Sequence, residues 1–593
     1  MILQSLVRHY DALAENGRVS PPGWSIARVS FALQIAPDGG LINIIPLKVP
    51  SKNKTGKKEV PQLMRVPEQI KKASGIAANF LCDSSSYMLG IDGKGKPERT
   101  KKCFEASKKL CHEILGSVNS EAAKSVLNFF DSWQPSEAEK NPVLAPFLDE
   151  IKEGGNIIFK TEDGSNVHND NDVKEAWEEH CRKKSEDSVV MRCLVTGRKA
   201  PVARLHPSIK GIKGAQPSGA SLVSYNSQAS ESYGHEQADK TGQGLNAPVS
   251  ETAAFKYGAA LNYMIADRDH VQRIADTTVL YWAEDAEPAY QDIFSVDISG
   301  SNEKITQADL DGIMKQIAGG ENTIAFNERT LNAENDFFVL GLAPNASRLS
   351  VRFFLQSEFG TMLRNLNAHN RRLKIVQPMG ENHELPLWNL LNETADQKSK
   401  DKNPPAPMAA AVLMAILKGT DYPQSLFESI MLRIRAEHDI NWRKAAIIKA
   451  YFLKNKEVTV PKEVLKVELN EKSNYLPYVL GRLFATLEMV QKTANPGIKS
   501  TIRNKYFTSA SATPAVIFPM LISLSQHHQR KLSEGSKVYY DKIISDLEGR
   551  IHETLPARFS LQEQGAFYLG YYHEKQALFT SDKKDDVKVK EEK

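Results

Sequence analysis

The chain has few cysteines and no long apolar run. Its five cysteines are an odd and sparse set, and none lies in the last 400 of the 593 residues. This usage is typical of a reducing compartment, so we expect a cytoplasmic protein. The longest nearly uninterrupted apolar run, Met408–Leu417, has about half the length of a membrane span, so no membrane association is expected. Apolar residues at helical spacing from Ile2 to Leu13 predict a surface helix and not a signal peptide.

Catalytic motifs are also missing. No serine-hydrolase, zinc-protease or calcium-loop pattern occurs. The nearest match to a phosphate-binding loop runs from Gly90 to Lys96, but Pro97 follows where a hydroxyl group should hold magnesium. His438 and Asp439 form the only His-Asp dipeptide, and the apolar residues around them favour an ordinary amphipathic helix. We therefore expect no enzyme activity, no metal and no cofactor.

A zinc site would have to combine His180, Cys181, Cys193 and His206. Their spacings are long, and no Cys-x-x-Cys pair occurs in the chain. Cys193 lies in an apolar stretch, which favours a small core residue. The alternative to a protein without enzyme activity is a metal-dependent nucleic-acid-processing enzyme. It would need carboxylates or histidines clustered near the basic loops of the chain.

Positive charge is concentrated in the N-terminal part. Residues 1–110 contain 18 Lys and Arg against 9 Asp and Glu, although the whole chain carries only +4. This asymmetry favours an anionic partner, and a solvated lysine-rich surface is the alternative interpretation. The candidate DNA contacts in this part are Lys52, Lys54, Lys57, Lys58, Lys71, Lys72 and Asn79.

Residues 188–230 contain no Asp or Glu but six Lys and Arg. The centre of this stretch is rich in glycine, which lets a backbone approach a ligand closely. Exposed N–H and hydroxyl groups donate to phosphate oxygens, lysines add counterion release, and amide side chains can contact base edges. A flexible polar loop is the alternative. The candidate DNA contacts here are Lys210, Lys213, Gln216, Ser218, Ser221 and Asn226.

The secondary-structure pattern predicts an α+β fold. Three β-hairpins are expected over 29–47, 189–205 and 337–355, together with a strand at 277–283 and helices within 100–130. We expect an α+β DNA-recognition region over 1–395, which a break near 135–150 would divide into two subdomains. A polar, proline-rich linker over 396–407 would follow it.

Beyond that linker the strand signals fade, and amphipathic patterns predict a helical bundle over 408–580. The segment 441–505 has 13 Lys and Arg against 5 Asp and Glu. The candidates for phosphate contact in this bundle are Arg482, Lys492, Lys499, Arg503 and Lys505. The tail 581–593 is almost entirely charged and is expected to be disordered.

Several segments resemble the large subunits of type I-C CRISPR surveillance complexes, known as Cascade. The most specific match runs from Cys193-Leu194-Val195-Thr196-Gly197 through Arg204-Leu205-His206-Pro207 to Gly219-Ala220-Ser221. Further matches are Ser74–Leu81, Asn246–Ser250, Leu480–Ala485 and Ser509–Pro514, so the resemblance covers nearly the whole chain. Pro217 departs from the family pattern, in which a Ser is expected.

The resemblance implies a non-catalytic subunit that reads the protospacer-adjacent motif on duplex DNA and promotes R-loop formation, while guide RNA pairs with the rest of the target. It also implies partners: crRNA-bound Cascade backbone subunits, a crRNA-processing subunit, a helicase-nuclease and target double-stranded DNA. The bundle, which would resemble a Cascade small subunit, would hold the displaced strand or the heteroduplex backbone.

The resemblance further implies a C-terminal small-subunit fragment that is made from the same gene by internal translation. Such a fragment must begin where no later helix is cut. A start between Lys454 and Asn474, for example at Val464 or Val467, meets that condition because this segment is polar and contains Pro461.

Overall fold

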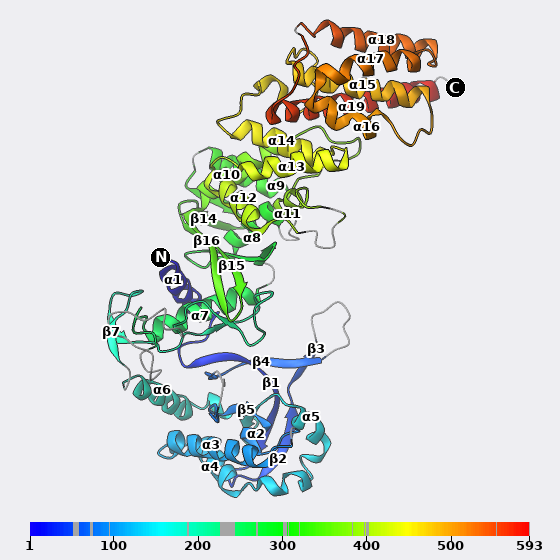
Figure 1. The fold of residues 1–593 in the computed structure, drawn as a ribbon. Coiled ribbons are helices and arrows are strands. Elements are labelled where there is room, and N and C mark those ends of the chain that lie inside the picture. Colours follow the sequence, from blue (N-terminus) through cyan, green and yellow to red (C-terminus); the bar gives the residue numbers. More distant parts are fainter. Residues whose placement is uncertain are drawn as a thin grey trace. The chain divides into compact units, whose positions relative to one another are not determined.

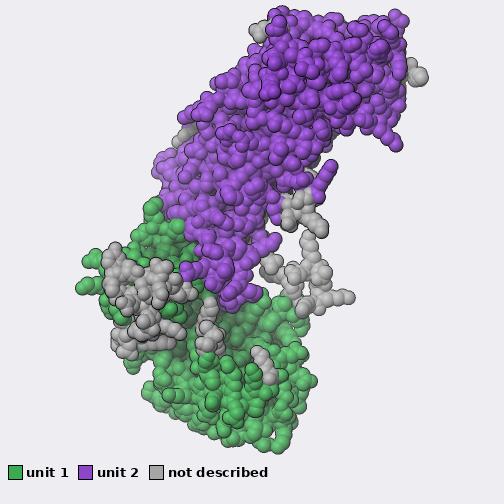
Figure 2. Space-filling model, viewed as in Figure 1, with its two compact units in different colours: residues 1–209, 221–263 green, residues 210–220, 264–593 purple. Residues whose placement is uncertain are grey.

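The computed structural model describes residues 1–50, 59–70, 75–93, 95–186, 189–225, 243–267, 271–299, 305, 307–319, 321–381, 383–396, 398, 403–552 and 554–591. The chain divides into two units, coloured separately in Figure 2: unit 1 comprises residues 1–209 and 221–263, and unit 2 comprises residues 210–220 and 264–593. Within the described part, no helix combines the length and apolar character needed to cross a bilayer.

Unit 1 combines a sheet with short helices (Figure 1). Its main elements are α1 (Ile2–Glu15), β1 (Trp24–Ile35), β2 (Leu41–Pro46), β3 (Lys48–Pro50), β4 (Glu59–Pro67), β5 (Cys82–Ser84), α2 (Ser85–Met88), α3 (Pro97–Leu115), α4 (Glu121–Ser132), α5 (Leu148–Glu153), β6 (Asn156–Lys160), α6 (Asn171–Glu186), β7 (Val190–Arg192), β8 (Lys199–Pro201), β9 (Ser208–Ile209) and most of α7 (Glu251–Ala266). The strand order is β3-β4-β1-β6-β5, and β2 pairs with β1. β1 is antiparallel to β2 and β4 and parallel to β6.

Both faces of this sheet are buried at its centre, where β1 pairs with β6. On one face, Phe159 of β6 packs edge-on against Phe129 and Phe130 of α4, with ring centroids 5.1 and 5.7 Å apart. On the other face lies a smaller cluster that includes Val29 and Ile158, which are fully buried. Burial on both faces explains why β1 is apolar over nearly its whole second half.

Unit 2 combines a second sheet with many helices (Figure 1). Its elements are β11 (Val271–Ile274), β12 (Thr277–Ala283), α8 (Pro288–Ser299), α9 (Gln307–Ala318), β13 (Thr323–Phe326), β14 (Arg329–Asn332), β15 (Asp336–Asn345), β16 (Arg348–Glu358), α10 (Phe359–Leu373), α11 (Leu387–Asn392), α12 (Ala406–Lys418), α13 (Gln424–Glu437), α14 (Trp442–Lys454), α15 (Leu476–Ala494), α16 (Ile502–Ala512), α17 (Pro514–Gln529), α18 (Glu534–Gly549) and α19 (Leu561–Glu591). The long strands run in the order β11-β12-β15-β16, all antiparallel.

The helices α15 and α19 approach each other at two glycines. A Cβ atom on Gly481 would lie 2.0 Å from the carbonyl oxygen of Phe567, and one on Gly570 would lie 2.1 Å from that of Tyr478. Neither position has room for any side chain, so the two backbones are in direct contact. Large aromatic side chains, among them Phe484, then surround this contact and form the core of the bundle.

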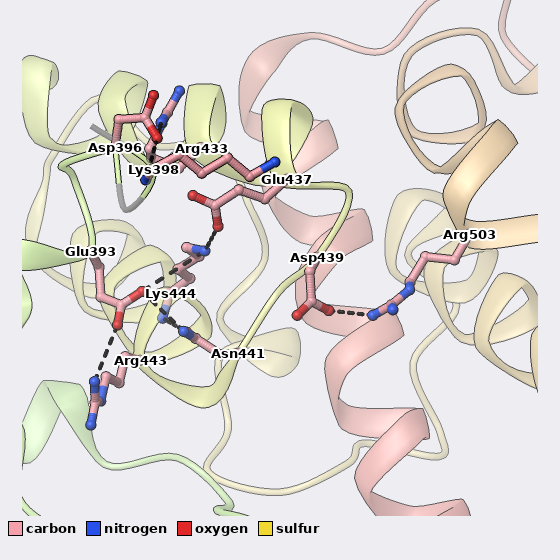
Figure 3. Close-up of polar contacts among 10 residues, drawn as sticks. All are labelled: Glu393, Asp396, Lys398, Arg433, Glu437, Asp439, Asn441, Arg443, Lys444 and Arg503. Carbon is pink, nitrogen blue, oxygen red and sulfur yellow. Dashed lines mark hydrogen bonds and ion pairs between the residues drawn. The ribbon is translucent and has the colours of Figure 1, made fainter. Parts of the chain in front are cut away.

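The predicted linker at 396–407 does not coincide with the division between the units. One continuous hydrophobic core runs through unit 2 from Ile274 to Leu578. The chain just before the predicted linker is held by α14: the Glu393 carboxylate accepts hydrogen bonds from Asn441 at 3.0 Å and Arg443 at 3.4 Å. Figure 3 shows Glu393 between these two side chains and Lys444.

The predicted α+β class and the predicted hairpins are confirmed where local patterns were strong. The β1–β2 and β15–β16 pairs correspond to the first and third predicted hairpins. The β7–β8 pair corresponds to the second only in part, because its second strand is Lys199–Pro201, whereas Val202–Leu205 was predicted. The tail differs, since α19 continues to Glu591 where disorder was expected. Extending an existing helix avoids the cost of nucleation, so the lysine- and aspartate-rich residues at its end can continue it with few apolar anchors.

Candidate nucleic-acid interface

The glycine-rich loop at 210–220 is anchored by its apolar residues. Ile212 is 4% exposed and Ala220 is fully buried, which fixes the loop at both ends. Gly211 and Gly214 have φ angles of +87° and +84°, in the left-handed region that favours glycine. A Cβ atom on Gly214 would lie 3.2 Å from the ring of Pro344, so this glycine also permits a close approach to the end of β15.

The polar residues of this loop point to solvent. Lys210, Lys213, Gln216 and Ser218 are exposed, and Ser221 is half-buried. The loop is shaped by backbone bonds, including one from the Gly219 N–H to the Gln216 carbonyl at 2.9 Å. Lys213, Gln216 and Ser218 of the predicted DNA-contacting set are therefore exposed to solvent, whereas Asn226 lies outside the described residues.

A cavity of about 450 Å³ opens beside this loop. It is lined by Lys213 and Gly214, by Arg273 and residues 275–278 around the β11–β12 turn, by Pro344, and by Asn403, Pro404 and Ala406 at and just before the start of α12. Asp276, the acidic residue of this lining, is already paired with Arg352 at 2.9 Å. Positive charge thus dominates the cavity, which suits a phosphate group.

Sequence reasoning missed Arg273, which lines the cavity, and Arg352, which pairs with Asp276 of the lining. Arg273 is exposed on β11, and Arg352 on β16 lies beside the turn that follows β11. No local pattern marks either residue as a partner of Lys213. They come together because β12 pairs with β15 and β15 with β16, which brings three chain segments to one edge of the sheet.

The predicted N-terminal DNA contacts comprise six lysines and Asn79. Lys52, Lys54, Lys57, Lys58, Lys71 and Lys72 lie outside the described residues. The prediction for Asn79 is wrong, because this side chain is only 8% exposed. Its Oδ1 atom accepts the Ile70 N–H at 2.9 Å, so Asn79 holds a turn and has no free face for DNA.

The prediction for Arg482 is also wrong. The side chain is 3% exposed on α15, and its Nε donates to the Glu574 carboxylate of α19 at 2.7 Å. A guanidinium group that is paired inside the bundle cannot reach a phosphate. Lys499 and Lys505, by contrast, are exposed and remain candidates.

Two further bundle cations are partly engaged. Lys492 pairs with the buried Glu488 carboxylate at 2.8 Å, and Arg503 pairs with Asp439. Figure 3 shows Asp439 and Arg503 directed toward one another from two different segments. Burial raises the pKa of Glu488, but hydrogen bonds from Lys492 and Tyr571 lower it by a larger amount. The net pKa of Glu488 is therefore below its usual value. The carboxylate is therefore charged and holds Lys492 in place.

The sequence features that could have indicated an enzyme have structural roles. His438 has a left-handed backbone at the end of α13, and the Asp439 carboxylate forms an ion pair with Arg503. His206 bonds Tyr257 at 2.6 Å, and His180 lies 3.6 Å from Glu113. Among the described residues, no three His, Cys, Asp or Glu side chains are grouped so that they could hold a metal ion.

A family model described as CRISPR-associated protein (Cas_Csd1) matches residues 6–579. The chain belongs to this family. The match covers nearly the full length, including both units and the helical bundle. A comparison with curated proteins found no match. For a Csd1-family chain, a role within an assembly of CRISPR-associated proteins is the coarse function that the match supports.

Proposed function

We propose that this Csd1-family chain is the non-catalytic large subunit of a type I-C Cascade complex, in which it recognises the protospacer-adjacent motif on duplex DNA. The observation that carries the proposal is the exposed loop 210–220 beside a cavity lined by Lys213 and Arg273. A protein that recognises a short DNA motif needs groups that contact phosphates and groups that contact base edges, and this loop carries both cations and an amide side chain. Phosphate contacts position the duplex, and base-edge contacts specify the sequence.

The proposal includes partners. We expect crRNA-bound backbone subunits, a crRNA-processing subunit and a helicase-nuclease to associate with the chain in the cytoplasm, and R-loop formation to follow motif binding. The family match supports an assembly of this kind in general terms.

The test is target binding by the assembled complex. Lys213→Ala and Arg273→Gln should each flatten the dependence of binding on salt by roughly one unit, equally for all motif sequences. Gln216→Ala should instead cost about 1–3 kcal/mol at one base position only. Lys124→Ala, an exposed lysine on α4, is the matched control and should change neither quantity. If all three variants bind like the control, this loop is not the reader.

The absence of catalysis is part of the proposal. Purified chain incubated with plasmid, magnesium or manganese, and ATP should leave the DNA intact. Cleavage that persists through repurification and disappears in Asp439→Asn would favour the metal-dependent enzyme instead. The pairing of Asp439 with Arg503 supports the expected result, because the carboxylate is occupied.

We also propose that α15–α19 exists as a separate small subunit made from the same gene. α14 ends at Lys454 and α15 begins at Leu476, so a start between Lys454 and Asn474 leaves all five later helices whole. Intact mass spectrometry of the complex, expressed from the untagged gene, should find a fragment that begins in this interval. A complex without such a fragment would contradict the proposal.

A further inference from the structure

The turn between β7 and β8 has the hydrogen bonds of a metal-binding knuckle. The Cys193 Sγ accepts the backbone N–H groups of Val195 and Thr196, each at 3.4 Å. Gly197 follows with φ of +72°. In zinc knuckles of the form Cys-x-x-Cys-Gly, the first sulfur accepts the same two N–H groups and the glycine has the same left-handed backbone. Thr196 stands where such a knuckle has its second cysteine.

The N-terminus of α7 completes the arrangement. The Ser250 N–H donates to the Cys193 Sγ at 3.2 Å, and the Ser250 Oγ accepts the Ala253 N–H at 3.2 Å. Zinc sites that join a knuckle to a helix take their second pair of ligands from positions with Cys-x-x-Cys spacing in the first helical turn. Here those two positions hold Ser250 and Ala253. Cys193, Ser250 and Ala253 are 1%, 3% and 1% exposed, whereas Thr196 lies at the exposed side of the arrangement.

We propose that residues 190–203 and 247–266 form a metal-free zinc finger, in which hydrogen bonds to the Cys193 sulfur replace the metal ion as the clamp. The four ligand positions are occupied by one Cys, a Thr, a Ser and an Ala, and this set does not fit zinc, which takes thiolate, imidazole or carboxylate ligands. The inference is independent of which nucleic acid the chain binds.

The electrostatics of the sulfur agree with this assignment. Burial raises the pKa of Cys193, but hydrogen bonds from the hydroxyl and N–H groups of Thr196 and Ser250 lower it to about 7. In a zinc site the metal charge compensates the thiolate. In this chain a set of convergent donors does so, and no ligand beyond the protein is needed.

The clamp closes the base of a long insertion. The Ala203 N–H donates to the Val249 carbonyl and the Leu194 N–H to the Pro248 carbonyl, both at 2.8 Å. The residues on either side of the segment 204–247, which includes the glycine-rich loop, are therefore joined by these two hydrogen bonds. The finger thus holds both ends of the segment that carries the proposed DNA contacts.

The first experiment rebuilds the metal site. The full-length variant Thr196→Cys, Ser250→Cys, Ala253→Cys is purified without metal and titrated with Co²⁺. We expect one equivalent to bind with the intense visible spectrum of tetrahedral thiolate coordination, and zinc to displace it. The same variant with Cys193→Ala, and the wild-type chain, should both lack the four-sulfur spectrum. A folded triple variant that binds no Co²⁺, or binds it only in octahedral form, would overturn the proposal.

The second experiment needs no metal and remains informative if the triple variant does not fold. Cys193→Val keeps an apolar side chain, with one additional methyl group, but removes the acceptor, so the N–H groups that faced the sulfur become unpaired. Amide exchange in peptides over 193–198 and 249–254 should accelerate by about tenfold or more. Cys193→Ser retains an acceptor, so its amide exchange rates in these peptides should lie between those of the wild type and of Cys193→Val. Wild-type protection of both peptides in Cys193→Val would refute the clamp.

Discussion

Replacing Gly481 by alanine is the sharpest test of how the helical bundle is built. In a helix this substitution ordinarily stabilises by about 1 kcal/mol, because glycine loses more backbone entropy on folding. At Gly481 the new methyl group would meet the Phe567 carbonyl oxygen at 2.0 Å and the Tyr571 nitrogen at 2.8 Å. Both obstacles are backbone atoms of α19, which cannot rotate away as a side chain could.

The two helices would have to separate by roughly 1.4 Å to reach ordinary contact distance, and a gap of about 0.5–1 Å already loses a quarter to a half of the dispersion energy. Overpacking of cores typically costs about 1–3 kcal/mol and occasionally more. Since the contact is between two backbones, we take about 3 kcal/mol as the lower bound of the overpacking cost. After the helix gain of about 1 kcal/mol, the net loss is about 2 kcal/mol or more.

Hydrogen exchange measured by mass spectrometry reports this loss locally. A loss of about 2 kcal/mol corresponds to roughly 30-fold faster exchange in peptides from α15 and α19. Gly312→Ala is the matched control: Gly312 lies within α9, and a Cβ atom there would have nothing within 4 Å. That variant should slow exchange in α9. Unchanged or slower exchange in α15 of Gly481→Ala would refute the close-contact argument.

Three further predictions concern buried and exposed cations of the bundle and its neighbours. Lys449 donates hydrogen bonds to two carbonyl groups, and burial lowers its pKa to about 8. Between pH values of about 8 and about 10.4, the unfolded state therefore binds more protons than the folded state. Thermal unfolding should therefore show the wild type gaining stability relative to Lys449→Met as the pH rises from about 7.5 to about 9.5, and a constant difference would contradict it. Arg482→Met should cost about 3–5 kcal/mol because it leaves the Glu574 carboxylate buried and unpaired, and chemical denaturation should show recovery when Glu574→Met is added. Lys499→Ala combined with Lys505→Ala should flatten the salt dependence of strand binding by up to about two units without changing the unfolding temperature, and an unchanged slope would exclude these lysines as phosphate contacts.

The candidate site could be predicted in part from the sequence because its signals are local. The absence of acidic residues over 188–230, and the glycines within that stretch, identify an exposed basic loop without knowledge of its neighbours. The same reasoning could not find Arg273, since its relation to Lys213 depends on strand pairing between distant segments. It also placed Arg482 on the surface, because charge alone does not reveal that Glu574 lies opposite, 92 residues away.

The local elements and the family membership follow from the amino-acid sequence. Runs of β-branched residues around short turns specify the β1–β2 and β15–β16 hairpins, because strand and turn preferences act over a few residues. Tertiary packing sets where the units divide, which cations are buried, and how Thr196 and Ser250 converge on the Cys193 sulfur. These outcomes depend on packing between residues far apart in the chain, where the free energy of each polar group is set by partners that no local pattern identifies.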